Sequence, residues 1–446
     1  MSATPHRVVV LGGGFGGLYT VQALVRAPVQ LLLVDQRNFH LFQPLLYQVA
    51  TGMLSPGDIA APLRSVLAGH RNVTVFQAVA AGVDAQAREL IVDGGRIPYD
   101  TLVAATGTTQ SYFGNERWQD DAPSMKTVED ALDVRRRIFS AFEIAELDPV
   151  QAERDGWLQF VVIGAGPTGV EMAGALAELA RGTLRNDFRR IDPSKARIML
   201  VEGSARVLPG FAESLSRKAE ARLRKMGVEV RTGTRVTSIQ GRRAALKTGE
   251  REEVVMAGTV LWAAGVQATP MGKAIAEATG CRLDSMGRVL VEPDLTVPGH
   301  PEMFVIGDLA NYQDPSGRPI PGMAPAAMQQ GLYAARTVMA RLKGKTLPPF
   351  RYRNKGMLAV IGRNAAVAEL GRLKLSGFFA WAIWALVHIN YLIEFDSKVL
   401  VLLQWAWTYF TRKRSARLIT GEGGLMKLIR RGGAPDAAAE RGRAAG

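Results

Sequence analysis

The chain has 446 residues, 47% of them hydrophobic and 22% charged, so it is long enough for about two to four globular domains and is neither disordered nor fibrous. A single cysteine, Cys281, excludes a disulfide scaffold, a dithiol centre within the chain and a cysteine zinc cage. The five histidines are scattered without ligand spacing, so no metal site is expected. The net charge is +14, and its excess is concentrated after position 350, which indicates a local anionic partner.

The N-terminal region has the order of a βαβ dinucleotide-binding unit: strand, glycine turn, helix, strand and acid. The apolar run Val8–Leu11 leads into Gly-Gly-Gly-Phe-Gly-Gly, and the second strand ends at Asp35. Gly12 permits the tight turn, Gly14 lets the backbone approach a pyrophosphate, and Gly17 lets the helix pack on the strand. The helix N-terminus offers N–H groups to phosphates, and Asp35 can accept hydrogen bonds from a ribose.

The same pattern recurs 152 residues later, so the chain contains an internal repeat at domain scale. Here the glycines are Gly164, Gly166 and Gly169, and the second strand ends at Glu202. Glu202 lies 38 residues after Gly164, which predicts a helix extension or a loop over 181–195. A glycine turn that serves only chain reversal is the alternative. Two matches, each flanked by a strand and ended by an acid, favour nucleotide binding.

Two such turns predict two dinucleotides, and the economical pair is a flavin and a nicotinamide. The run Phe304–Asp308 places an acid at a strand end far downstream, and this segment would have to return to the first domain to complete a flavin site. FAD is therefore assigned to the first turn and the nicotinamide to the second. Glu202 would repel a 2′-phosphate, which predicts NADH over NADPH, although Arg206 nearby argues against this preference.

From about Arg7 to Thr420 the chain resembles the type II NADH dehydrogenases, which are single-subunit, non-pumping NADH:quinone oxidoreductases. The most specific segments are Phe42–Gly52, Phe304–Ala310 and Ala324–Gln330. The resemblance implies an α/β fold with two Rossmann-like dinucleotide-binding domains, as in glutathione-reductase-like flavoproteins, and a C-terminal helical segment that anchors the protein to the membrane. It also implies non-covalent FAD, NADH as substrate, and ubiquinone or menaquinone as acceptor.

The expected domain organisation follows from the two repeats and the resemblance. The FAD-binding domain is expected in two segments, over 1–120 and 283–350, on either side of an NADH-binding domain over 155–282. A membrane-anchoring region is expected over 351–430 and a disordered tail over 431–446.

By position, the resemblance also implies a set of cofactor contacts. For FAD they are Gly12, Gly14, Gly17, Asp35, Thr106, Gly107 and Asp308. For NADH they are Gly164, Gly166, Gly169 and Glu202, and Gln43 and Gly265 are further cofactor-binding candidates.

Two residues are candidates for a catalytic role. Glu171 stands where the family has an acid near the nicotinamide and flavin, although the helix dipole alone would favour an acid there. Gln329 matches the second glutamine of the family's Ala-Gln-x-Ala-x-Gln quinone motif, and Pro325 replaces the first. Because a proline side chain cannot bond a quinone carbonyl, either Gln329 acts alone or Gln330 or Gln43 assists. The alternative for Gln329 is a glutamine facing solvent.

The C-terminal region contains apolar stretches over 377–393 and 399–410, both too short to span a bilayer. On one helix, Trp381, Trp384, His388, Tyr391 and Phe395 would form an aromatic stripe suited to a headgroup boundary. The basic residues Arg412, Lys413, Arg414 and Arg417 follow directly. Because the aromatic residues lie in apolar runs with the charge at their end, anionic lipid is favoured over nucleic acid as the partner. The alternative is that the stripe packs on the protein's own core or forms a dimer interface.

Other functions remain open at this point. A soluble ferredoxin or rubredoxin reductase would share both glycine turns, and a membrane-docked flavoprotein could act as a redox sensor without turnover. A disulfide reductase or a sulfide:quinone oxidoreductase is excluded, because each would need paired cysteines and this chain has one. The absence of a targeting segment, together with the resemblance, predicts a peripheral protein on the cytoplasmic side of a bacterial inner membrane, and a homodimer is compatible with it.

Overall fold

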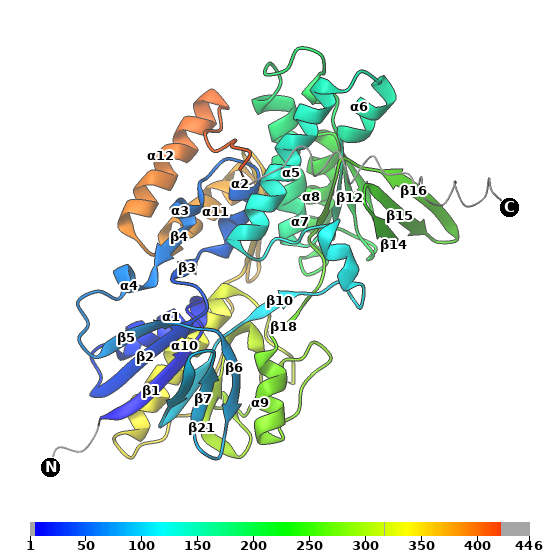
Figure 1. Cartoon of the computed structure of the whole chain (residues 1–446). Helices are drawn as coiled ribbons and strands as arrows, with labels where there is room; N and C mark the ends of the chain where they lie inside the picture. Colours follow the sequence, from blue (N-terminus) through cyan, green and yellow to red (C-terminus); the bar gives the residue numbers. More distant parts are fainter. Residues whose placement is uncertain (1–4, 316, 421–446) are drawn as a thin grey trace. The chain divides into compact units, whose positions relative to one another are not determined.

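The computed structural model describes residues 5–315 and 317–420, which fold into two compact units (Figure 1). Of the described residues, unit 1 contains 5–41, 60–110 and 266–355, and unit 2 contains 42–59, 111–265 and 356–420. The segment 1–120, expected to belong wholly to the FAD-binding domain, therefore contributes residues to both units. The tail predicted to be disordered, 431–446, lies outside the described residues.

Unit 1 is built on a six-stranded sheet with the order β20-β21-β9-β1-β2-β5. These strands are β1 (His6–Leu11), β2 (Val29–Asp35), β5 (Val73–Gln77), β9 (Thr101–Ala104), β20 (Thr296–Val297) and β21 (His300–Val305). All neighbours are parallel except β20 and β21. Because β21 pairs with β9, the segment that ends in Asp308 does return to the sheet of the first glycine turn, as predicted.

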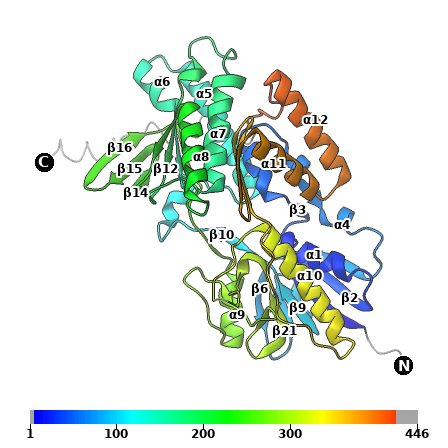
Figure 2. The same cartoon turned by 180° about the vertical axis from the view of Figure 1, so that it is seen from behind.

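Helix α1 (Phe15–Leu24) packs against α10 (Ala324–Arg341) in unit 1 (Figure 2). A side chain at Gly331 of α10 would overlap the carbonyl oxygen of Gly16, so glycine permits the close approach of the two helices. The remaining elements of the unit are short. They are β3 (Phe39–Leu41), β4 (Ala60–Pro62), α4 (Leu63–Val66), β6 (Ala80–Asp84), β7 (Glu89–Val92), β8 (Gly95–Pro98), β10 (Thr108–Gln110), β18 (Val266–Ala268), α9 (Met271–Thr279), β19 (Val289–Leu290) and β22 (Ala310–Asn311).

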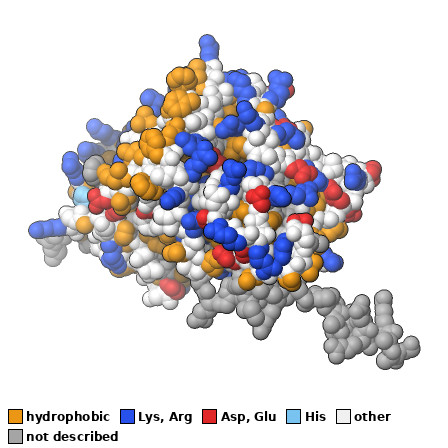
Figure 3. Space-filling view, turned by 90° about the horizontal axis from the view of Figure 1, so that it is seen from above, with side chains coloured by type: hydrophobic (Ala, Val, Ile, Leu, Met, Phe, Trp, Pro, Cys, Tyr) orange, Lys and Arg blue, Asp and Glu red, His pale blue; other side chains and the backbone are white. Residues whose placement is uncertain are grey.

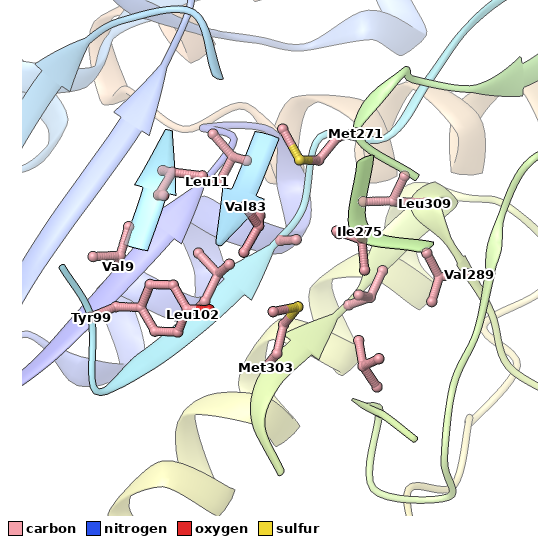
Figure 4. Packing of buried hydrophobic residues seen from close by; sticks show 14 of the residues in the cluster. Val9, Leu11, Val83, Tyr99, Leu102, Met271, Ile275, Val289, Met303 and Leu309 are labelled. Carbon is pink, nitrogen blue, oxygen red and sulfur yellow. The ribbon is translucent and has the colours of Figure 1, made fainter. Parts of the chain in front are cut away.

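One face of this sheet is covered by the β6–β8 meander and α9 (Figure 4). Val9 and Leu102 of the central strands pack in a cluster with Val83 of β6 and with Met271 and Ile275 of α9. The other face is covered by α1. Burial on both faces explains why Val8–Leu11 of β1 and Leu102–Ala104 of β9 are continuous apolar runs instead of alternating.

Unit 2 repeats the theme with a four-stranded parallel sheet of order β13-β12-β11-β17. The strands are β11 (Gln159–Ile163), β12 (Arg197–Val201), β13 (Val228–Arg231) and β17 (Thr259–Trp262). An antiparallel sheet of β14 (Thr234–Gln240), β15 (Arg243–Thr248) and β16 (Arg251–Met256) and the helices α5 (Val128–Leu147), α6 (Gln151–Trp157), α7 (Pro167–Glu178) and α8 (Glu213–Lys225) complete it. After α7 the chain continues in a π-helical turn over Leu179–Thr183 and then a loop, so a short helical extension and a loop together account for the long spacing before Glu202.

The C-terminal part of unit 2 is a three-stranded antiparallel sheet followed by two helices. The elements are β23 (Met357–Gly362), β24 (Ala365–Leu370), β25 (Leu373–Gly377), α11 (Phe378–Tyr391) and α12 (Phe395–Thr411). The segment 42–59 supplies α2 (Leu46–Ala50) and α3 (Pro56–Ile59), and α3 contacts α12. Among the described residues, no helix has both the length and the apolarity needed to cross a membrane.

The predicted aromatic stripe on one helix is wrong in part. Helix α11 ends at Tyr391, and Phe395 begins α12. Trp384 is only 2% exposed and stacks on Trp405 of α12, with 5.3 Å between ring centroids. The chain turns between the two helices at 392–394, and Asp396 and Lys398 lie in the first turns of α12. Part of the stripe therefore packs within the protein, as the alternative interpretation held.

Candidate functional site

The first glycine turn joins β1 to α1, and each glycine has a distinct steric role. Gly12 has φ +103°, and a Cβ there would lie 2.5 Å from the carbonyl oxygen of Ala105. A Cβ at Gly17 would overlap the Gly12 carbonyl oxygen. Gly14, at the start of α1, has nothing within 4 Å of the Cβ position. The turn and packing roles predicted for Gly12 and Gly17 are confirmed, and open space lies at the position predicted for phosphate approach.

Two buried or partly buried side chains hold this turn through Gly13. The backbone N–H of Gly13 donates to Asp35 Oδ2 at 2.5 Å, and Arg37 N–H donates to Oδ1 at 2.7 Å. Burial raises the pKa of Asp35, and these two bonds oppose the shift. His40 Nδ1 donates to the Gly13 carbonyl oxygen at 2.8 Å, and burial lowers the pKa of His40 to about 4, so its ring is neutral. Sequence reasoning missed His40.

Three further predicted FAD residues belong to unit 1. Thr106 follows β9, and its hydroxyl lies 2.6 Å from that of Thr269. Gly107 has φ +70° and open space at its Cβ position. Asp308 lies in a 3-10 turn directly after β21. Because β1, β9 and β21 are neighbouring parallel strands, their carboxyl ends bring the glycine turn, Thr106 and Asp308 to one edge of the sheet.

The second glycine turn, between β11 and α7, has the same geometry. Gly164 has φ +96°, a Cβ at Gly169 would overlap the Gly164 carbonyl oxygen, and Gly166 has nothing within 4 Å of its Cβ position. Glu202 follows β12, and its Oε2 accepts from Ala165 N–H at 2.7 Å. The acid after the second strand thus holds the turn in both repeats, besides being available to a ribose.

Both turns therefore fit a dinucleotide. A pyrophosphate needs backbone N–H groups at a helix N-terminus and room for its oxygens, and a Cβ-free edge at Gly14 and at Gly166 supplies that room. From the sequence, FAD was expected at the first turn.

Two further predicted cofactor-binding residues, Gln43 and Gly265, belong to unit 2. The Gln43 amide donates to the Lys126 carbonyl oxygen at 3.1 Å, and Gly265 has φ +72°.

The amide of Gln329 is engaged with backbone. Its Nε2 donates to the carbonyl oxygens of Pro325 at 3.1 Å and Arg353 at 3.0 Å, and its Oε1 accepts from Arg353 N–H at 3.0 Å. The neighbouring Gln330 is buried, and its Oε1 accepts from Gly307 N–H at 2.6 Å. Gln329 is half-buried, and a ligand at its amide would compete with the Arg353 backbone.

Glu171 lies one turn into α7 and lines a cavity of about 340 Å³ within unit 2. Burial raises the pKa of Glu171 to about 8, opposed only by the Val360 N–H at 3.4 Å. The side chain keeps some exposure because it faces the cavity. At neutral pH the carboxyl group therefore holds its proton.

A polar wall beside Glu171 was not found from the sequence. Tyr47 is buried, and its hydroxyl accepts from Gln48 Nε2 at 2.9 Å. The Gln48 Oε1 accepts from the indole N–H of Trp405 at 2.7 Å. Burial raises the pKa of Tyr47, and Glu171 raises it further. Tyr47 and Gln48 lie in the 42–52 motif, but no sequence pattern links them to Trp405.

The assignment of Arg414 to a lipid surface is wrong. Arg414 is buried, and its guanidinium donates to the carbonyl oxygens of Thr51 at 3.0 Å and Ala175 at 3.2 Å. Its Nη2 lies 3.8 Å from Glu178 Oε2. Arg417 forms an ion pair with Asp187. Only part of the C-terminal basic cluster is therefore available to an external anion.

Comparisons with known proteins agree with this geometry. The family model for pyridine nucleotide-disulphide oxidoreductases matches residues 6–331. The chain is 44% identical to the type II NADH:quinone oxidoreductase NdhA of Mycobacterium tuberculosis, over 95% of this chain and 91% of that protein. It is 30% identical to the type II NADH:quinone oxidoreductase of Staphylococcus haemolyticus, over 82% and 90% of the two chains.

Among solved structures, the fold matches NDH2 from Plasmodium falciparum in complex with NADH, with a TM-score of 0.84, 19% identity, and coverage of 94% of this chain and 100% of that one. The identity to this structure is low, so the match supports the fold alone. The family model and the bacterial relatives together establish that the chain belongs to the pyridine nucleotide-disulphide oxidoreductases and, within them, to the type II NADH:quinone oxidoreductases.

Proposed function

We propose that this chain oxidises NADH at the second glycine turn and passes two electrons, through FAD held at the first, to a membrane quinone without pumping protons. The observation that carries the proposal is the pair of backbone cradles, each with a glycine that leaves phosphate-sized space at a helix N-terminus. The reaction itself, reduction of a quinone by NADH, is the one that gives the family its name. FAD supplies the redox chemistry when it is bound, by taking a hydride from NADH and giving electrons to the quinone.

For FAD, the residues that would hold it are those at the carboxyl edge of the unit 1 sheet. Gly12 and Gly14 shape the turn, and the N-terminus of α1 would offer its N–H groups to the phosphates. Asp35 stays oriented by its bonds from Gly13 and Arg37, which leave lone pairs for a ribose hydroxyl. Asp308 stands at the end of β21 at the same edge.

Selection of NADH over NADPH rests on Glu202. Its carboxylate is fixed by N–H groups of Ala165 and Ser204, at 2.7 and 2.8 Å. A carboxylate held there accepts hydrogen bonds from a ribose hydroxyl and repels a 2′-phosphate. The guanidinium of Arg206 donates to the Pro209 carbonyl oxygen at 2.8 Å, so one of its donors is already committed.

Glu171 supplies a proton to the reduced quinone. Reduction of a quinone to a quinol takes up two protons with two electrons, and a carboxyl group with a pKa of about 8 carries a proton at neutral pH. The cavity that Glu171 lines has walls of Trp381, Trp384 and Trp405, which suit an apolar acceptor. Gln329 is the candidate for orienting a quinone carbonyl, in exchange for its present backbone partners.

Helices α11 and α12 dock the protein on lipid. Their outer surface carries Phe379, Leu403, Trp407 and Phe410, with exposures of 73, 61, 63 and 82%. Figure 3 shows hydrophobic side chains gathered in a band on this face of the molecule, with Lys and Arg side chains beside them. An exposed apolar face edged by cations fits an interfacial anchor. We place it on the cytoplasmic side of a bacterial inner membrane, where NADH is supplied. A homodimer remains an expectation.

Anaerobic spectroscopy tests the proposal. NADH should bleach the flavin absorbance of the purified protein, and a soluble quinone analogue should restore it. Bleaching without reoxidation by quinone would favour a ferredoxin-type reductase or a sensor, and a protein that cannot be reconstituted with FAD would contradict the proposal.

A further inference from the structure

The cavity beside Glu171 has an unusual charge balance. Five arginines and two glutamates line it, with no lysine or aspartate. Glu171 holds its proton, and Glu178 is committed to the Arg363 backbone N–H and to Arg414. The cavity lining therefore carries a surplus of positive charge that its own carboxylates do not balance.

Three of these arginines come from separate elements and are half-buried. The Arg363 guanidinium, after β23, stacks over the Tyr409 ring at 4.0 Å. Arg222 of α8 donates to the Arg363 carbonyl oxygen at 3.3 Å, and Arg181 donates to the Gly227 carbonyl oxygen at 3.2 Å. Within the described part of the chain, none of the three has a carboxylate oxygen within 4 Å of its guanidinium.

Grouped guanidinium groups without counter-ions favour an anionic ligand. Each is partly desolvated and close to like charges, which costs free energy that an external anion would recover. Guanidinium donors form a planar fork that matches phosphate oxygens. The cavity also contains Arg412, which is exposed and directly follows α12. An anion here would lie beside the apolar end of α12, at Trp407 and Phe410.

The arginines lie toward the C-terminal end of α7, where the Arg363 N–H bonds Glu178 and the Thr183 hydroxyl bonds the Arg412 carbonyl oxygen, whereas Glu171 lies near the start of that helix. We propose that Arg222, Arg363 and Arg412 bind, at that end of the cavity, the phosphate of an anionic phospholipid whose acyl chains lie along the end of α12. The site differs from the C-terminal basic cluster expected from the sequence, because α8 and the turn after β23 supply two of its three cations. It rests on the proposed function in one respect, that α12 docks on lipid. The phosphate chemistry could also be met by free phosphate, which the experiment separates.

The test measures binding of the FAD-loaded enzyme to vesicles by co-sedimentation. Vesicles of phosphatidylcholine, whose headgroup phosphate is balanced by choline, report the apolar docking, and vesicles that also contain phosphatidylglycerol report the added binding to an anionic headgroup. Arg363→Gln and Arg222→Gln should each weaken binding to the anionic vesicles about fivefold and leave the phosphatidylcholine result unchanged. Arg363→Lys should lose less, because it keeps the charge but not the fork.

Arg217→Gln is the matched control. It removes the same charge from the same helix as Arg222, but Arg217 pairs with Glu213 and is not part of the cavity. Equal losses in Arg217→Gln and Arg222→Gln would overturn the site in favour of general surface charge. Flavin content and thermal midpoint confirm that each variant is folded.

Two soluble probes separate the sources and the two proposals. Monomeric dihexanoyl phosphatidylglycerol should quench tryptophan fluorescence of the wild type and not of Arg363→Gln. If inorganic phosphate competes with it at equal concentration, the site takes free phosphate and the lipid proposal is overturned. If the monomer binds but vesicles of neither composition do, the phosphate site stands and the docking in the proposed function fails.

Discussion

Gln48 accepts a hydrogen bond from the indole N–H of Trp405, 357 residues later in the chain, at 2.7 Å. Its amide donates in turn to the Tyr47 hydroxyl. This bond ties α12, whose outer surface is apolar, to the short helix α2 that stands beside Glu171. The exposed apolar helix α12 and the cavity that Glu171 lines are therefore joined by a buried polar contact.

Replacing Trp405 by Phe should destabilise the protein by about 1–3 kcal/mol, because the side-chain oxygen of the buried Gln48 would lose its indole donor. Chemical denaturation monitored by flavin release measures the change. Trp407→Phe is the control, since Trp407 is exposed and its stability cost should stay within about 0.5 kcal/mol. Equal costs for the two variants would contradict the role of the Gln48 bond.

Glu171→Gln should slow quinone reduction by about 100-fold or more while NADH still reduces the flavin. In the wild type, quinone reduction should fall as pH rises through about 8, where Glu171 loses its proton, and the variant should lack this inflection. Stopped-flow measurement of the two half-reactions across pH provides the check. An unchanged inflection in Glu171→Gln would assign it to another group.

The same pKa gives a sign for stability. Because the folded-state pKa of Glu171 is raised, the folded protein binds more protons than the unfolded chain between the ordinary carboxyl range and about pH 8. The contribution of Glu171 to the free energy of unfolding should therefore decline as pH rises through that window and level off above it. Glu171→Gln should remove this decline, which paired denaturation curves of variant and wild type would show.

The glycines of the first turn should separate folding from cofactor binding. Gly17→Ala forces a Cβ onto the Gly12 carbonyl oxygen and should cost at least about 3 kcal/mol. Gly14→Ala meets open space, so the protein should fold within about 1 kcal/mol of the wild type but lose FAD at least about tenfold more readily. Flavin fluorescence on dilution measures retention. Full FAD retention in Gly14→Ala would rule out close phosphate approach there.

Gln329→Ala should impair quinone reduction more than flavin reduction by NADH. Gln329→Glu is the control variant. It keeps an acceptor for the Arg353 N–H but loses the amide donors, so it separates the two halves of the Gln329 side chain. Equal losses in both half-reactions for Gln329→Ala would assign the residue to holding the 353 backbone instead of the substrate.

Local patterns predicted the frame of the site well. Each glycine turn, its flanking strands and its terminal acid lie close in sequence, so spacing alone indicated Asp35 and Glu202. The positions of the glycines also indicate where the backbone leaves no room for a side chain, as at Gly169, where a Cβ would overlap the Gly164 carbonyl oxygen. The return of β21 to the first sheet was also predictable, because the strand that ends near Asp308 had to reach the first glycine turn to complete a flavin site.

Long-range polar partners could not be predicted in the same way. Arg414 reads as one more cation in a basic run, and only the fold brings the carbonyl oxygens of Thr51 and Ala175 to its guanidinium. Trp384 has the spacing of an interfacial aromatic, yet the turn between α11 and α12 buries it against Trp405. Such residues are polar or amphipathic, and their burial depends on which partners the chain supplies elsewhere.

The burial of Arg414 and Ala416 makes the short segment after α12 part of the interior of unit 2. Truncation of the chain before Arg414 would remove the guanidinium donor of the carbonyl oxygens of Thr51 and Ala175. It would also release Gly52, whose carbonyl oxygen accepts from Ala416 N–H. Truncation directly after α12 should therefore destabilise unit 2, and substitutions meant to raise solubility belong on the exposed apolar surface of that helix instead.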